Sequence, residues 1–83
     1  MKEKDRCIIC LEQNGWKCDI DDATDDYTSY YKDGCIGVDF DNEEMVFISD
    51  IGDFLHVPIN YYTLIGVLME YRQITCNYTS IKN

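Results

Sequence analysis

Two acidic stretches contain the side chains of this sequence that are best suited to chemistry. Residues 19–27, DIDDATDDY, place five aspartates in nine positions, and residues 41–44, DNEE, add three more acids. Neither stretch contains a lysine or an arginine. Clustered carboxylates can coordinate a cation, act as a general acid and base, or form a negative surface for a basic partner. They can also do no more than keep a loop in water, because charge runs are usually solvated.

The first stretch begins like a calcium-binding EF-hand loop but does not continue like one. Asp19 and Asp21 match the first and third ligand positions of that loop. Ala23, Thr24 and Tyr30 then stand where the motif needs a ligand, a glycine and a glutamate. We therefore predict no metal site and no cofactor, and leave open a weak cation site shared by the two acidic stretches.

The sequence offers little support for catalysis. Paired acids need a pocket that separates their pKa values, and short exposed loops rarely supply one. Cys7 and Cys10 have C-x-x-C spacing, but the second cysteine pair of a zinc site is missing, and a redox motif would not lie inside a helix. We interpret both as buried thiols, since free cysteine packs as a small hydrophobe. No catalytic residue is assigned, and we predict that the protein is not an enzyme.

The net charge limits the classes of partner. The chain of 83 residues has 16 acidic and 7 basic residues, which gives a formal net charge of −9. This charge argues against nucleic acid and anionic membranes as direct partners and favours a cationic one. Length and a hydrophobic content of 46% predict one domain over residues 1–83, with fraying expected at residues 1–4 and 76–83.

The start of the chain and its cysteines predict a cellular location. The segment MKEKDRCIICLEQ is charged and has no long apolar core, so we predict no signal peptide. No apolar run approaches the roughly 20 residues of a membrane span. The five cysteines cannot all pair internally, and without a secretion signal they are expected to be reduced. These features predict a cytoplasmic protein.

Two helices are expected, one near each end of the chain. The first covers residues 4–14 and ends at Gly15, with Trp16 as the apolar contact back onto its last turn. The second is a long helix over residues 59–74, just after the only proline, and it is apolar almost all round. Residues 75–83 are either coil or one more strand.

The segments between the helices have the short patterns of β-strands. The predicted strands cover residues 16–20, 27–32, 35–40, 45–49 and 54–57. Asp33-Gly34 predicts a two-residue hairpin turn, in which both central residues adopt positive φ. That turn pairs Tyr31 with Ile36, Ser29 with Val38, Tyr27 with Phe40, and Tyr30 with Gly37, where the tyrosine ring would cover the bare glycine. The next hairpin pairs Phe40 with Met45 and Val38 with Phe47.

The expected fold class is α+β. An N-terminal helix leads into an antiparallel β-meander of three to five strands, and a long C-terminal helix packs on one face of the sheet. The other face retains apolar character, and either the first helix or a second protomer could cover it.

A meander places the two acidic stretches at the same end of the sheet, because successive loops alternate between the two ends. The predicted partner-binding surface, the acidic edge, consists of Asp21, Asp22, Asp25, Asp26, Asp41, Glu43 and Glu44. Tyr27 and Tyr30 are expected beside it as exposed anchors, since tyrosine is enriched at binding hot spots. Carboxylates on strands about 4.8 Å apart repel one another, and folding does not need them there.

The main hypothesis is a small acidic protein-interaction module that binds a basic protein through the acidic edge. Regularly placed carboxylates could mimic nucleic-acid phosphates, so the partner could be a nucleic-acid-binding protein that the module inhibits. In size, charge and predicted topology the chain resembles compact acidic α/β proteins of phages and mobile elements, some of which are nucleic-acid mimics that inhibit nucleases. The alternative is a structural or oligomeric domain, such as a homodimer, that associates through apolar helix or sheet surface.

Overall fold

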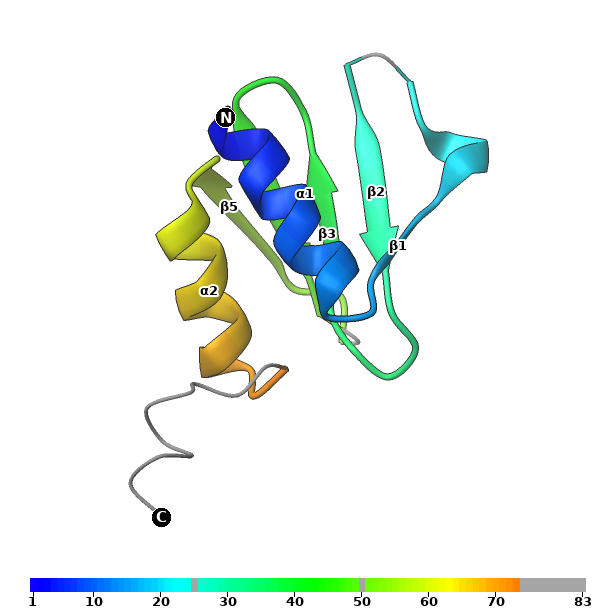
Figure 1. Ribbon diagram of the computed structural model, residues 1–83. Helices are drawn as coiled ribbons and strands as arrows, with labels where there is room; N and C mark the ends of the chain where they lie inside the picture. Colours follow the sequence, from blue (N-terminus) through cyan, green and yellow to red (C-terminus); the bar gives the residue numbers. More distant parts are fainter. Residues whose placement is uncertain (25, 50, 74–83) are drawn as a thin grey trace.

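Two helices lie on one face of a five-stranded antiparallel sheet. The computed structural model of the chain describes residues 1–24, 26–49 and 51–73 (Figure 1). Its elements in chain order are α1 (Glu3–Gln13), β1 (Lys17–Cys18), the 3-10 helix η1 (Ile20–Asp22), β2 (Thr28–Tyr31), β3 (Gly37–Phe40), β4 (Glu44–Ile48), β5 (Phe54–Pro58) and α2 (Tyr61–Glu70). The strands are neighbours in the order β1-β2-β3-β4-β5, so the sheet is a meander.

The α+β class, the N-terminal helix and the antiparallel meander are confirmed. All five predicted strands are present, although β1 is only two residues long. The prediction of a long C-terminal helix is wrong, because α2 has 10 residues and does not extend over 59–74. The expectations for residues 75–83, and for fraying at 76–83, lie outside the described residues.

Local interactions at both ends make α2 short. At its start the Asn60 side chain accepts a hydrogen bond from the Thr63 N–H at 3.1 Å, which caps the helix two residues after Pro58 has ended β5. At its end Arg72 adopts a left-handed φ of 58°. The Gln73 N–H then donates back to the Leu68 carbonyl at 2.7 Å, which closes the last turn and prevents the helix from continuing.

The end of α1 follows the sequence prediction. Gly15 has a φ of +99°, a conformation that side chains other than glycine rarely adopt. The Gly15 N–H donates to the Glu12 carbonyl at 3.1 Å, and the Trp16 N–H donates to the Leu11 carbonyl at 2.9 Å. These two bonds form a Schellman motif, so the chain turns back toward the sheet immediately after the helix.

Trp16 joins α1 to the middle of the sheet. Its side chain is 2% exposed, and its indole N–H donates to the Ile36 carbonyl, just before β3, at 3.0 Å. Lys32 covers the same ring, with Nζ 4.8 Å from the ring centroid, and donates to the Asn14 carbonyl at 2.7 Å. The end of α1 and the loop between β2 and β3 are therefore held together by two hydrogen bonds and one cation–π contact.

The start of α1 is also bound to the rest of the fold. The helix begins at Glu3, within residues 1–4, where fraying stays a prediction. The Glu3 carboxylate accepts a hydrogen bond from the Tyr61 N–H at 3.0 Å. Tyr61 is the first residue of α2, where a backbone N–H has no acceptor within the helix. The Arg6 guanidinium lies 4.3 Å from the centre of the Tyr61 ring. The two helices are therefore joined at their N-terminal ends.

The predicted register between β2 and β3 is wrong by one residue. Thr28 pairs with Phe40 and Tyr30 pairs with Val38, whereas β3 and β4 pair as predicted. The turn is longer than expected: Gly34 has a φ of 76°, but Asp33 does not have the positive φ that a two-residue turn requires. Five residues, 32–36, therefore connect the two strands.

The shift by one residue reverses the face of every side chain in β2. Tyr30 lies on the inner face, is 5% exposed and meets the Phe40 ring edge-on at 5.8 Å between centroids. The expectation that Tyr30 is an exposed anchor is therefore wrong. The expected Tyr30–Gly37 pair is absent as well, because Tyr30 pairs with Val38.

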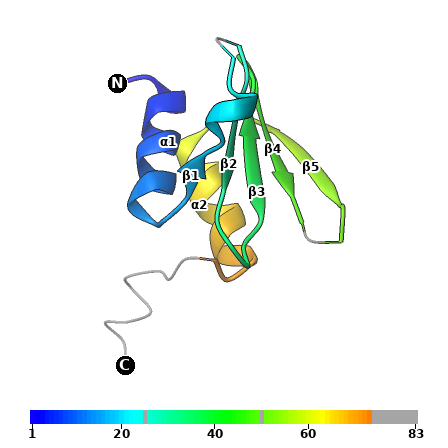
Figure 2. The ribbon, with the colours of Figure 1, turned by 90° about the vertical axis from the view of Figure 1, so that its right-hand side faces the viewer.

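The hydrophobic core lies between the inner face of the sheet and the helices. The helices contribute Cys7, Cys10, Leu11, Leu64 and Leu68, and the strands contribute Tyr30, Val38, Phe40, Met45 and Phe47. Both α1 and α2 lie on this side, so the first helix does not cover the second face of the sheet (Figure 2). That outer face carries neither helix.

Replacing Trp16 with phenylalanine removes the indole donor from the Ile36 carbonyl. We expect the free energy of unfolding to fall by about 2–4 kcal/mol through the lost hydrogen bond and the cavity. Denaturation in urea, followed by circular dichroism, measures the change. Tyr31→Phe is the matched control, because Tyr31 is 48% exposed and its substitution should change stability by less than about 0.5 kcal/mol. Equal effects of the two substitutions would contradict the prediction.

Candidate functional site

The two acidic loops meet at one end of the sheet. The loop before β2 and the loop between β3 and β4 lie side by side at the top of Figure 1. The Asn42 amide of one loop donates to the Asp26 carboxylate of the other at 3.3 Å. Because this bond crosses between the loops, the carboxylates on both belong to one continuous surface.

The acids of the acidic edge differ in their surroundings. Asp21, Asp26, Glu43 and Glu44 are exposed. Asp21 lies on η1, which projects beside β2 and away from the loop between β3 and β4 (Figure 1). Asp25 lies outside the described residues. Asp22 is the last residue of η1. The surface is therefore a band that runs from η1 to the loop between β3 and β4.

Asp41 has a structural role within this band. Its carboxylate accepts hydrogen bonds from the backbone N–H groups of Glu43 at 2.7 Å and Glu44 at 2.6 Å. These bonds lower the pKa of the Asp41 carboxyl below its usual range, and the nearby charge of Lys4 lowers it further. Asp41 thus shapes the turn that presents the two glutamates.

Lys4 is a feature of the acidic edge that the sequence analysis missed. The start of α1 lies at the same end of the sheet as the loop between β3 and β4 (Figure 1). Its charge acts on Asp41, so the acidic edge is partly neutralised on the side facing α1. Only the packing of α1 on the sheet reveals this, because the two residues are 37 positions apart in the sequence.

Asp39 is a second missed residue, and it positions Tyr27. It lies in the middle strand β3, on the outer face, and is 8% exposed. Its carboxylate accepts hydrogen bonds from the Ser29 hydroxyl, at 2.6 Å, and from the Tyr27 hydroxyl. Tyr27 is 40% exposed and is held next to the acidic loops. An aspartate inside an otherwise apolar strand is the sequence signal that could have identified this group.

The outer face of the sheet combines aromatic side chains with few charges. Tyr31 of β2 is 48% exposed, and Phe54 of β5 is 62% exposed. Val46 and Ile48 of β4 are half-buried on the same face. With Tyr27 at its upper end, this face offers apolar contact area directly beside the acidic edge.

The thiols of the C-x-x-C pair lie in the core, as interpreted from the sequence. Cys7 is 0% exposed and Cys10 is 7% exposed. Burial raises the pKa of Cys7 to about 11, and the nearby charge of Glu3 adds to the effect. A neutral, buried thiol is a poor nucleophile and a poor metal ligand. Across residues 1–24, 26–49 and 51–73, no group of three or more histidines, cysteines and acids could hold a metal ion.

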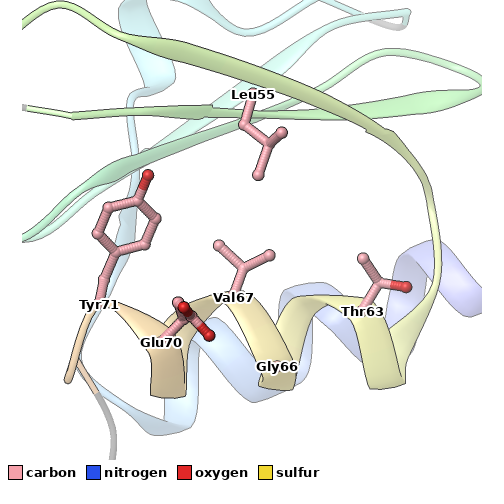
Figure 3. Close-up of a pocket in the computed structure, with 6 residues that line it drawn as sticks. All are labelled: Leu55, Thr63, Gly66, Val67, Glu70 and Tyr71. Carbon is pink, nitrogen blue, oxygen red and sulfur yellow. The ribbon is translucent and has the colours of Figure 1, made fainter.

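A groove lies between β5 and α2, away from the acidic edge. It has a volume of about 500 Å³ and is lined by Leu55, Thr63, Gly66, Val67, Glu70 and Tyr71. Leu55 points into it from the strand, and Thr63 and Val67 point into it from the helix (Figure 3). Glu70 is the one carboxylate of this lining. Sequence reasoning gave no indication of the groove.

Comparison with known proteins finds no family model, no curated protein and no solved structure that matches this chain. In the part of the chain that the structure describes, no helix is long and apolar enough to cross a membrane.

The Tyr27–Asp39 hydrogen bond should be measurable as a coupling energy. A double-mutant cycle of Tyr27→Phe and Asp39→Asn, measured by urea denaturation, should give about 1–2 kcal/mol, since hydrogen bonds to carboxylates are stronger than neutral ones. Tyr62→Phe combined with Asp39→Asn is the control, because Tyr62 is 72% exposed on α2. That pair should be additive within about 0.5 kcal/mol. A coupling near zero in the first cycle would contradict the assignment.

The Cys7 thiol should make stability depend on pH under alkaline conditions. Its pKa is 9.0 when unperturbed and about 11 in the folded protein, so the unfolded state loses the proton first. This contribution to stability is complete below pH 9 and is lost as the pH rises from 9.0 to about 11. Urea midpoints measured across that range should fall in the wild type and fall less steeply in Cys7→Ala. Identical slopes would show that Cys7 is not responsible.

Proposed function

We propose that the protein is a non-enzymatic interaction module that binds a basic protein through its acidic edge. The observation that carries the proposal is the Asn42–Asp26 hydrogen bond, which joins the two acidic loops into one surface. Exposed carboxylates on both loops then act together on a cationic partner. A nucleic-acid-binding protein is the partner class that regularly carries such a basic surface.

Tyr27 supports the proposal because it supplies an anchor beside the charges. Surface charges steer association and set specificity, whereas buried aromatic side chains provide most of the binding energy. Tyr27 is 40% exposed, and its hydroxyl is fixed by Asp39, so its ring loses little conformational freedom when a partner covers it. The partner would contact the acidic loops and the adjoining part of the outer face together.

The surroundings of the acids favour binding over catalysis. Asp21, Asp26, Glu43 and Glu44 are exposed, so their carboxylates are accessible to water. A general acid–base pair needs a pocket that desolvates one of its members. The groove described above lies between β5 and α2, and Glu70 is the one carboxylate that lines it. The acidic edge therefore has the character of a surface that neutralises positive charge.

Charge removal from the acidic edge should weaken binding. The test variant combines Asp21→Asn, Asp26→Asn and Glu43→Gln, and we expect the affinity for the basic partner to fall about tenfold or more at low salt. The partner is first captured from a lysate of the source organism, identified by mass spectrometry and then titrated by calorimetry. Raising the salt concentration from about 0.1 M to about 0.5 M should weaken wild-type binding, because the charges are screened.

The matched control removes the same number of charges at the opposite end of the sheet. It combines Glu12→Gln, Asp33→Asn and Asp53→Asn, all of which are exposed. Its affinity should change by less than about threefold. Equal losses in the two variants would mean that net charge, and not the acidic edge, drives the interaction. Full binding by the test variant would refute the proposal.

A further inference from the structure

The free edge of β5 has none of the charged side chains that commonly prevent strands from pairing between molecules, and Pro58 at its end is the one protective residue there. β5 is the last strand of the meander, so among the described strands only β4 pairs with it. Free edges are usually protected by charged side chains. Residues 54–60, FLHVPIN, contain no aspartate, glutamate, lysine or arginine. Phe54 is 62% exposed and Leu55 is 41% exposed.

The hydrogen bonds between β4 and β5 show which backbone groups face outward. The Ile59 N–H donates to the Glu43 carbonyl at 3.2 Å, and the Ser49 N–H donates to the Asp53 carbonyl at 3.0 Å. Both bonds are in register with the β4–β5 ladder. In an antiparallel ladder, hydrogen-bonded pairs alternate with pairs that make no such bond. The odd-numbered residues of β5 therefore bond to β4.

The even-numbered residues of β5 point their backbone groups toward the free edge. Leu55 and Val57 bond inward, while Phe54, His56 and Pro58 face outward. Proline has no N–H, so the edge offers its donors only at Phe54 and His56. A strand that pairs with this edge must place backbone carbonyls opposite the N–H groups of Phe54 and His56.

The groove beside α2 leaves room for a second chain. Leu55 lies on the inner face opposite Phe47, which is 2% exposed, yet Leu55 itself is 41% exposed. Gly66 of α2 lines the groove, and an added Cβ there would meet nothing within 4 Å. A glycine weakens the middle of a helix, and no contact within the described chain requires the missing side chain. The absence of a side chain at Gly66 leaves the groove wider on the side of α2.

We infer that the protein forms a symmetric homodimer in which β5 pairs antiparallel with β5 of a second copy, with Leu55 opposite Leu55. In this register Phe54 and His56 of each copy exchange backbone hydrogen bonds with His56 and Phe54 of the other. Both donors are used, and Pro58 lies outside the paired segment. The two Leu55 side chains meet on the inner face at the mouths of the two grooves, at a position where paired strands approach most closely.

Other registers satisfy the edge less well. Centring the pair on His56 places Phe54 opposite Pro58, so that the Phe54 carbonyl has no donor, and it brings the two His56 side chains together. Centring it on Val57 places His56 opposite Pro58 and leaves both Phe54 donors without a carbonyl on a paired residue. Pro58 therefore favours the Leu55-centred register.

The handedness of crossovers disfavours a strand of the same chain at the free edge of β5. A segment that followed α2 and joined the free edge of β5 would run parallel to β5. In Figure 1 the helices lie in front, β5 points upward, and its free edge is on the left, so this crossover would be left-handed. About 98% of such crossovers are right-handed. A second copy meets no such restriction, and the uncharged edge lets two chains of net charge −9 approach there.

Sedimentation velocity over a range of protein and salt concentrations tests the dimer. Association should strengthen with salt, because salt screens the repulsion between two copies of net charge −9. This dependence is opposite to that expected for the acidic edge, so either proposal can fail without the other. A wild-type chain that remains monomeric at high protein and high salt would overturn the inference.

Two substitutions in β5 and one control test the location of the interface. Leu55→Lys should weaken the dimer at least about tenfold, and His56→Pro should do the same because it removes an outward donor that makes no bond to β4. Tyr31→Lys adds the same charge to an exposed aromatic position on β2, and it should change the dissociation constant less than about twofold. Circular dichroism confirms that each variant is folded. Equal weakening by Tyr31→Lys would place the interface elsewhere.

A disulfide test decides the register. In a chain with serine at positions 18, 35 and 76, Leu55→Cys should form a covalent dimer on mild oxidation, since facing residues at such positions lie within disulfide reach. Val57→Cys in the same background should not, because the register separates the two Val57 positions. Equal cross-linking of both variants would overturn the Leu55-centred pairing.

Discussion

The hydrogen bond from the Trp16 indole to the Ile36 carbonyl is the interaction on which the rest of the fold depends. It is buried, spans 20 positions of sequence and joins the end of α1 to the start of β3 at 3.0 Å. Gly15 makes it possible, because its left-handed conformation turns the chain from the helix directly to the sheet. Once Trp16 is seated, α1 has one position on the inner face, and α2 occupies the space beside it.

This arrangement leaves two surfaces of different character. Both helices cover the inner face, so the outer face carries neither α1 nor α2 (Figure 2). The free edge of β5 pairs with no other strand among the described residues. The acidic edge is highly charged and hydrated, whereas β5 is uncharged and apolar. The acidic edge suits a partner whose binding weakens with salt, and β5 suits a partner whose binding persists at high salt. The two can operate in the same molecule because they lie on different parts of the sheet.

Much of the fold could be predicted because its signals are local. The glycine that ends α1, the strand patterns and the acidic loops each depend on a few neighbouring residues. The position of the acidic loops at one end also followed, since a meander alternates its ends. The pairing of β2 with β3 could not be predicted, because Asp33-Gly34 suggested a two-residue turn and five residues form the connection. The length of α2 was missed because Asn60 and Arg72 impose its ends, against an apolar pattern that would allow a longer helix.

By itself the sequence determined the net charge, the order of helices and strands, and the two loops where carboxylates gather. These depend on composition and short-range pattern. The tertiary structure decided which other side chains lie near those loops. It buried Tyr30, attached Tyr27 to Asp39 and brought Lys4 close to Asp41. The physical reason is that side chains alternate across a strand, so a single residue of register, set by long-range packing, decides which of them face the core and which face a partner.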